Sequence, residues 1–306
     1  MNSLAPLAAD LRGGLVATAV VLPQAIAFGV TVFAPYLGTA AGALAGLVSA
    51  IGLLLVSGAG GGTIGLISGP SGAALVLLTG TAAGLVTSGV APANIATALF
   101  VVTVLAGLFQ LLIALAGGGR LMKFVPYPVI AGLATGIGLL LINSQLRPAL
   151  GIGYAGTWSQ WHWLPVIVAA TAFIIARHAS RIPPYLPGPI AGLIGGTMLF
   201  QILVYGFGPP AVPDAWVVGA LPALREFRPA FAEPVAWASL PWPLLLQAAF
   251  ALAVLVSLNT LLTAVLADTA TGQRHNARRE LLAQGVGQVA VGLAGGMAGS
   301  ASVGGT

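Results

Sequence analysis

Long apolar segments, separated by short polar breaks, run through nearly the whole chain. Nine of them have the length of a helix that crosses a bilayer and show little alternation between apolar and polar positions. They are predicted at about residues 13–32, 38–56, 70–90, 95–116, 125–146, 163–177, 186–206, 242–267 and 280–297. A tenth begins near Gly299 and stops at Thr306. The pattern predicts an all-α polytopic membrane protein.

The third segment cannot be one unbroken helix. Seven glycines in residues 57–72 weaken a helix, and Pro70 lacks the amide hydrogen that a helix interior needs. We expect an extended lead-in over residues 63–68 and a half-helix from about Pro70 onward. A helix that begins inside the bilayer points its unpaired N–H groups and a partial positive charge at one spot. Gly69, Pro70, Ser71 and Gly72 are therefore predicted to form an anion site.

Composition strengthens the membrane assignment and narrows the chemistry. Hydrophobic residues make up 58% of the chain and charged residues 6%, with a mean hydropathy of +1.01, which excludes an ordinary soluble domain. No Asp, Glu, Lys or Arg lies near the middle of a predicted span, so amides and hydroxyls would have to hold a ligand there. The chain has no cysteine, no paired catalytic carboxylates and no clustered metal ligands. We therefore expect a non-enzyme without cofactor or metal.

Charge in the loops predicts the orientation. With the N-terminus in the cytoplasm, the inner side receives eight basic residues: Arg12, Arg120, Lys123, Arg177, Arg181, Arg274, Arg278 and Arg279. Three fall outside, namely Arg147, Arg225 and Arg228, and the six tryptophans also lie on the outer side. This distribution obeys the positive-inside rule. The net charge of +5 is thus a topology signal, and no nucleic-acid partner is expected.

Two helix-breaking segments suggest a repeated architecture. Residues 207–241 are rich in proline and carry acidic residues, so they are predicted to be an outer linker between two halves. The small, glycine-rich residues 295–306 then form a second break at the mouth of a span, as residues 57–72 do in the first half. Paired breaks of this kind indicate the central site of a transporter. A chain that stops here is expected to lack its C-terminal portion.

Polar residues within two spans have two interpretations each. Gln24 follows Pro23 in the first span and either lines a site or bonds to a neighbouring helix at a kink. Asn259 and Thr263, one turn apart in the eighth span, either line a cavity or let helices approach and bond. The polar run 268–280 is predicted to be a plain cytoplasmic loop.

Four motifs carry a resemblance to a known family. They are Leu22-Pro-Gln-Ala-Ile-Ala-Phe, Ile67-Ser-Gly-Pro-Ser-Gly-Ala, Val125-Pro-Tyr-Pro-Val-Ile-Ala-Gly and Thr271-Gly-Gln-Arg-His-Asn-Ala-Arg-Arg-Glu-Leu. In this order, and over nearly the whole chain, they resemble the sulfate permease (SulP) family of anion transporters. The resemblance implies two inverted seven-span repeats, a fold shared with the nucleobase transporters. Here that 7+7 fold would be incomplete, truncated after the start of the tenth span and without the cytoplasmic STAS domain.

The resemblance also implies a division of the chain into a core domain and a gate domain. Residues 1–116 would supply core spans one to four, and residues 242–306 core spans eight and nine and the start of span ten. Residues 117–206 would form gate spans five to seven, with 207–241 as the outer linker. By position, Gln24, Phe28, Ser71, Asn259, Thr263, Gly304 and Gly305 would line the anion site. Sodium-coupled members carry an acidic residue where Asn259 stands, so sodium coupling is not expected.

The function we predict is secondary active transport of a small anion by alternating access. The expected substrate is sulfate, bicarbonate or a dicarboxylate, and proton coupling stays open. The full-length protein is expected to be a homodimer in the bacterial cytoplasmic membrane. One alternative is a nucleobase transporter of the same fold. Another is a membrane scaffold or voltage-responsive protein that does not transport.

Overall fold

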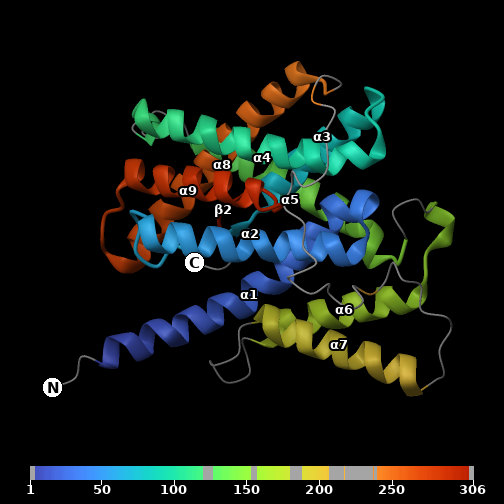
Figure 1. Ribbon diagram of the computed structural model, residues 1–306. Coiled ribbons are helices and arrows are strands. Elements are labelled where there is room, and N and C mark those ends of the chain that lie inside the picture. The colour runs from blue at the N-terminus through green and yellow to red at the C-terminus, as the bar shows by residue number, and fades with distance from the viewer. Residues whose placement is uncertain are drawn as a thin grey trace. The chain divides into compact units, whose positions relative to one another are not determined.

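The structure is a computed structural model that describes residues 4–119, 127–152, 157–179, 188–206, 217, 237 and 240–302. Its helices are α1 (Leu4–Leu37), α2 (Thr39–Gly60), α3 (Gly72–Thr87), α4 (Pro92–Leu115), α5 (Tyr127–Ala149), η2 (Trp158–Gln160), α6 (Trp163–His178), α7 (Gly188–Gly206), α8 (Trp242–Thr271) and α9 (Ala277–Leu293), shown in Figure 1. Its strands are β1 (Ser68–Pro70) and β2 (Gly299–Ala301).

Among the described helices, five are long and apolar enough to cross a membrane. They are Gly13–Leu37 within α1, and α2, α4, α7 and α8. The apolar helices α3 and α6 have 16 residues each, which is about 24 Å and shorter than the ~30 Å hydrocarbon core. The predicted all-α membrane fold is confirmed.

The chain forms two compact units. One unit contains Met1–Val20 and Leu141–Gly219, and the other contains Val21–Leu140 and Ala220–Thr306. In the first unit α6 packs along α7, where glycines bring the two backbones close together. A Cβ atom at Gly192 would lie 2.5 Å from the carbonyl oxygen of Ala172, so this crossing depends on a small residue.

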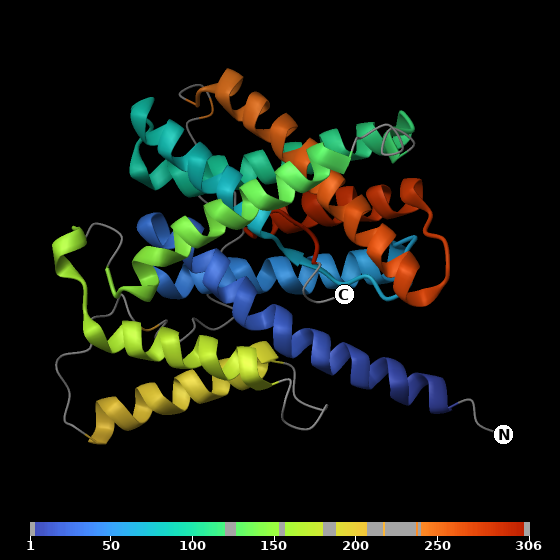
Figure 2. The ribbon, with the colours of Figure 1, turned by 180° about the vertical axis from the view of Figure 1, so that it is seen from behind.

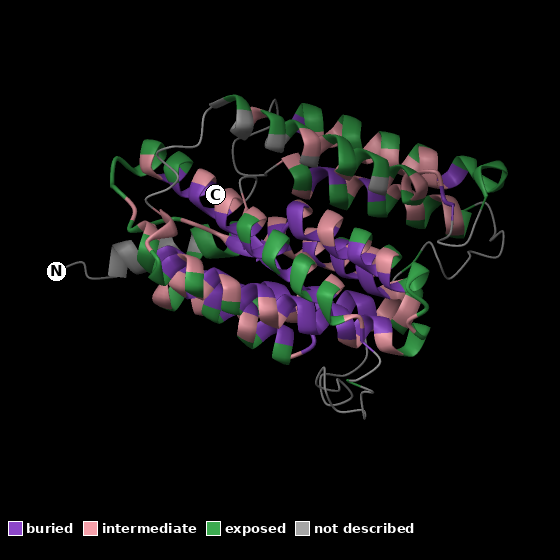
Figure 3. Cartoon of the chain, turned by 90° about the horizontal axis from the view of Figure 1, so that it is seen from above, coloured by how far each residue is buried: buried purple, intermediate pink, exposed green. Residues whose placement is uncertain are grey.

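The second unit surrounds the two strands with helices. In the two opposite views of Figures 1 and 2, the strands lie among α2, α8 and α9. β1 packs against α2, and β2 packs against α8, while α4 runs along α9. Buried residues are concentrated on α2, α4, α8 and α9, whereas α6 and α7 carry mostly exposed and intermediate residues; Figure 3 colours the ribbon by this burial. The core of the described chain therefore lies around the strand pair.

Helices α1 and α2 also meet through glycine. A Cβ atom at Gly46 would lie 2.0 Å from the carbonyl oxygen of Ala25, and one at Gly29 would lie 2.3 Å from that of Gly42. Both distances are too short for any side chain, so each glycine is required by the close approach of the backbones. The result is that α1, from Val21 onward, is held against the same helix that contacts β1.

Several element boundaries differ from the sequence-based expectation. α1 continues through Pro23 and Pro35 to Leu37, and α2 keeps residues 57–60 helical. The lead-in contains a turn at Ile64–Gly65 before the extended part, because Gly65 adopts a φ of 75°. α8 extends to Thr271 and ends at Gly272, whose φ of 69° forms a left-handed cap.

Candidate functional site: a buried helix start beside a strand pair

The third span is broken as predicted, but its helix begins two residues later. The prediction that Pro70 opens the helix is wrong, because Pro70 ends β1 and α3 begins at Gly72. Ser71 is the N-cap, with extended backbone angles of −121° and 152°. Its hydroxyl accepts a hydrogen bond from the Ala74 N–H at 3.3 Å. A serine with this geometry satisfies one of the free amides of the first turn, so Ser71 stops the strand and starts the helix.

The remaining first-turn amides give this helix start its chemistry. In an α-helix the first N–H groups have no intrahelical acceptor, and together they carry about half a positive charge. The residues around this end are buried, with Ser71 6% exposed and Ala73 2% exposed. No charged residue occurs between Gly62 and Arg120 in the sequence. The arrangement suits an anion, because amide hydrogens supply the donors and no carboxylate of this stretch opposes it.

β1 and β2 form a two-stranded antiparallel sheet that sets the position of α3. Ser68 pairs with Ala301, Gly69 with Ser300, and Pro70 with Gly299. The backbones are so close at the last pair that a Cβ atom at Gly299 would lie 2.1 Å from the Gly69 carbonyl oxygen. Segments 230 residues apart in sequence, 69 and 299, thus meet directly beside the start of α3.

α8 contributes two side chains that hold β2. The Asn259 amide nitrogen donates to the Ser300 hydroxyl at 2.7 Å and to the Ala301 carbonyl oxygen at 3.1 Å. The Ala301 N–H donates to the Thr260 hydroxyl at 3.3 Å. Both N–H groups of the Asn259 amide are therefore used by β2. A direct contact between Asn259 and an anion stays a prediction.

The other residues predicted for the site from α1 and α8 lie in the same unit. Thr263 is buried, and its hydroxyl donates to the Asn259 carbonyl oxygen at 2.9 Å within α8. Phe28 is buried and Gln24 half-buried, one turn apart on α1. One turn before Gln24, Val21 belongs to a buried cluster against which Ile67 packs, and a methyl carbon of Val21 would lie 3.0 Å from a Cβ atom placed on Gly69. α1 therefore lies against β1.

Gly304 and Gly305, the candidates at the start of the tenth span, lie outside the described residues. Their part in the site stays a prediction. The same is true of any contact between an anion and Gly69, Pro70, Ser71 or Gly72.

Three buried residues of α9 were not singled out as site residues from the sequence. Glu280, Gln284 and Gln288 face the broken segments and bond to the loop after α2, to β1 and to β2 respectively. Their spacing of four residues along one helix was the available signal. It was not usable without knowing that two strands lie beside this helix.

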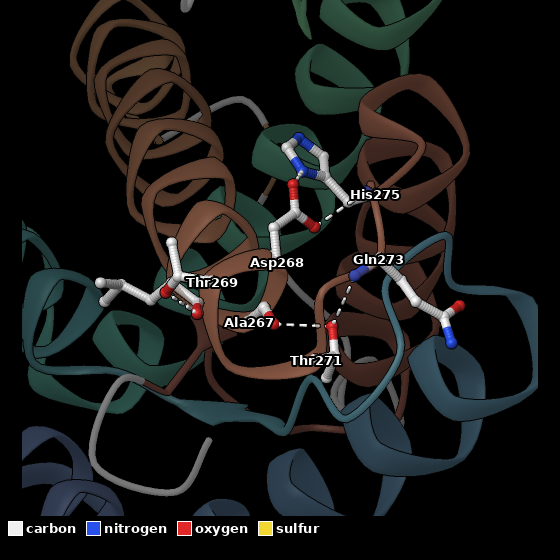
Figure 4. Close-up of polar contacts among 7 residues, drawn as sticks. Ala267, Asp268, Thr269, Thr271, Gln273 and His275 are labelled. Atoms are coloured by element: carbon white, nitrogen blue, oxygen red, sulfur yellow. Dashed lines mark hydrogen bonds and ion pairs between the residues drawn. The ribbon is translucent and has the colours of Figure 1, made fainter.

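The polar turn between α8 and α9 is ordered by one carboxylate, as Figure 4 shows. Asp268 accepts the His275 backbone N–H at 2.8 Å, and its other oxygen lies 2.7 Å from His275 Nδ1. The Thr271 hydroxyl donates to the Ala267 carbonyl oxygen at 2.8 Å. These bonds close the turn on itself. The prediction that the whole run 268–280 is a loop is wrong, because residues 268–271 end α8 and residues 277–280 begin α9.

A sequence profile of the sulfate permease family matches residues 7–306. The bicarbonate transporter BicA of Picosynechococcus sp. is 32% identical over 315 residues, which cover 97% of this chain and 52% of that protein. This chain therefore spans about half the length of such curated relatives.

Comparison with solved structures gives the same family. The transmembrane domain of a cyanobacterial bicarbonate transporter BicA matches with a TM-score of 0.83 and 32% identity, covering 99% of this chain and 76% of that one. The structure of SLC26A9 matches with a TM-score of 0.70 at 18% identity, covering 98% of this chain and 51% of that one, and supports the fold alone. The predicted transporter fold with a broken third span is confirmed. The chain belongs to the sulfate permease family.

Proposed function

We propose that this chain forms the anion-binding part of a secondary active transporter. The observation that carries the proposal is the start of α3, which is buried beside a strand pair and capped by Ser71. An N-terminus at this depth offers amide donors where a membrane protein has no water to supply them. Backbone amides favour an anion over a cation, and they do so without a fixed positive side chain.

The substrate class we propose is a small oxyanion or carboxylate: sulfate, bicarbonate or a dicarboxylate. The name of the family and the bicarbonate transporters among the relatives support this class. We expect no requirement for sodium, because residue 259 is an asparagine whose amide is bonded to β2. Proton coupling remains part of the proposal, to be tested with an imposed pH gradient.

Transport would proceed by alternating access, with a core moving against a gate. In this proposal residues 1–116 and 242–306 belong to the core, residues 117–206 to the gate, and residues 207–241 to an outer linker. The protein would be a homodimer in the bacterial cytoplasmic membrane with its N-terminus inside. The eight inner basic residues against three outer ones support that orientation.

Uptake into proteoliposomes tests the function. The product of the complete gene is reconstituted, and uptake of radiolabelled sulfate and radiolabelled bicarbonate is measured with and without sodium and with an inward proton gradient. We expect saturable, sodium-independent uptake of at least one of these anions. Ser71→Trp should abolish it by filling the start of α3, whereas Ser88→Trp, at the exposed far end of the same helix, should leave it intact.

Two outcomes would contradict the proposal. Uptake that uracil or xanthine inhibits, without uptake of any small anion, would indicate a nucleobase transporter. Assembly or charge movement that survives Ser71→Trp, with no flux in the wild type, would indicate a membrane scaffold or a voltage-responsive protein.

A further inference from the structure

One face of α9 carries a buried row of polar side chains. Glu280, Gln284 and Gln288 are four residues apart, so they follow one another along the same side of the helix. Glu280 is 1% exposed, and both glutamines are fully buried. The residues between them on this helix are mainly apolar or glycine. A buried row of polar side chains needs hydrogen-bond partners to be stable.

Each member of the row holds a different non-helical segment. Glu280 accepts the Gly62 N–H at 2.8 Å, in the glycine-rich loop after α2. The Gln284 amide nitrogen donates to the Ser68 hydroxyl on β1 at 2.5 Å. Gln288 exchanges two bonds with Gly299 on β2: its carbonyl oxygen accepts the Gly299 N–H at 3.1 Å, and its amide nitrogen donates to the Gly299 carbonyl oxygen.

The Gln288 amide takes the place of a third strand. It offers a C=O and an N–H to the N–H and C=O of one strand residue, as a neighbouring peptide would. A two-stranded ribbon is marginal by itself, and backbone groups at membrane depth need a partner because lipid supplies none. Loss of such a partner leaves a buried donor or acceptor with its full desolvation penalty.

We propose that Gln284 and Gln288 are positioning residues for the anion site. They fix the position of β1 and β2 along α9. β1 is followed directly by Ser71, the N-cap of α3, so its position also sets that of the first amides of α3. Neither glutamine needs to touch the anion, since each acts through a strand. The inference rests on the proposed function and identifies α9 as the helix that determines where the binding amides lie.

The experiment measures KM and maximal rate for uptake of radiolabelled sulfate and radiolabelled bicarbonate by reconstituted product of the complete gene. For Gln284→Leu and Gln288→Leu we expect KM to rise about tenfold or more, with a smaller change in maximal rate per folded protein. The melting temperature of the detergent-purified protein is recorded for every variant. A role limited to stability would lower the melting temperature and the maximal rate while leaving KM unchanged.

A milder variant keeps the test meaningful if either leucine variant fails to fold. Ser68→Ala removes only the hydroxyl that Gln284 binds. We expect Ser68→Ala to raise KM less than Gln284→Leu, which also removes the bond from Gln284 to Glu280. The double variant Ser68→Ala, Gln284→Leu should be no worse than Gln284→Leu alone, because both changes break the same bond between Ser68 and Gln284.

Gln110 supplies a matched control. It is fully buried on α4, the helix that runs along α9, and its amide has no hydrogen-bond partner among the described residues. Gln110→Leu should leave KM unchanged. An unchanged KM in Gln288→Leu and Ser68→Ala would overturn the positioning role, whereas absence of uptake in the wild type would overturn the proposed function instead.

Discussion

At the scale of single residues, buried polar side chains in this protein form hydrogen bonds with the backbone of non-helical segments. Ser49 on α2 accepts the Met297 N–H at 2.6 Å, Thr260 accepts that of Ala301, and Gln288 bonds Gly299. Hydroxyls and amides thereby satisfy the stretches that are not helical, as a water-free environment demands. These polar residues thus have a structural role, and they would affect a bound anion through the backbone segments to which they bond.

Ser71→Ala tests the cap. The change removes the acceptor of the Ala74 N–H, which should cost about 1 kcal/mol of stability and raise KM for anion uptake, because the first turn of α3 loosens. The control is Ser88→Ala, at the exposed C-terminal end of the same helix. Equal KM values for the two variants would show that the start of α3 has no special role.

Gly299→Ala tests the contact between the strands. The added methyl carbon would lie 2.1 Å from the Gly69 carbonyl oxygen, so β1 and β2 cannot keep their register. We expect loss of uptake and a lower melting temperature. Gly80→Ala in α3 meets no atom within 4 Å and should instead gain up to about 1 kcal/mol in helix stability. A Gly299→Ala protein with normal uptake would refute this close pairing.

Gln110→Leu tests the cost of an unpartnered amide. Neither amide atom of Gln110 has a partner within the described part of the chain, and such burial costs about 1–3 kcal/mol. The leucine variant should therefore melt at a higher temperature than the wild type in detergent. A clearly lower melting temperature would indicate that the amide has a partner in the working protein.

The sequence pointed to some of these residues and not to others. Ser71 could be identified because it follows a proline that breaks an apolar segment, and Asn259 because an amide in a span is unusual. Gln288 could not, because its partner is the backbone of Gly299, and a strand of three residues leaves no periodic pattern to recognise.

At the scale of elements, the pattern predicts the helices well and their ends less well. The length of the apolar segments identifies α2, α4 and α8. The start of α3 was predicted two residues too early, because proline fits both the end of an extended strand and the start of a helix, and Pro70 ends β1. α8 runs past its apolar residues to Thr271, since Gly272 can adopt the left-handed cap. Hydropathy alone contains neither piece of information.

The turn between α8 and α9 gives an element-scale prediction. Asp268→Ala leaves the backbone N–H and the ring Nδ1 of His275 without their acceptor, at a cost of about 1–3 kcal/mol. The loosened turn should be cut faster by trypsin after the exposed Arg274. Thr269→Ala is the control, because within the described part of the chain the Thr269 hydroxyl bonds inside its own helix, to Leu266. Equal cleavage rates in both variants would show that Asp268 does not order the turn.

At the scale of the molecule, membrane burial explains why a broken helix can be a binding site. Five described helices are long and apolar enough to span the bilayer. Two of them, α2 and α8, contact the strand pair beside the start of α3. Composition was sufficient to predict the membrane class, because 6% charged residues cannot cover a soluble surface of this size. Composition could not predict the pairing of residues 68–70 with residues 299–301, because contacts between distant segments depend on the whole fold.

The central claim, that an anion binds at the start of α3, is open to one direct measurement. These 306 residues contain no cysteine. With any cysteine elsewhere in the product of the complete gene replaced by serine, Ser71→Cys introduces a single thiol, whose rate of reaction with a water-soluble methanethiosulfonate reagent can be followed in proteoliposomes. The anion site predicts that the thiol reacts and that the transported anion slows the reaction about tenfold at saturation, while a thiol introduced by Ser88→Cys reacts at the same rate with or without it. A Ser71→Cys thiol that never reacts, or reacts at a rate no small anion changes, would contradict the site.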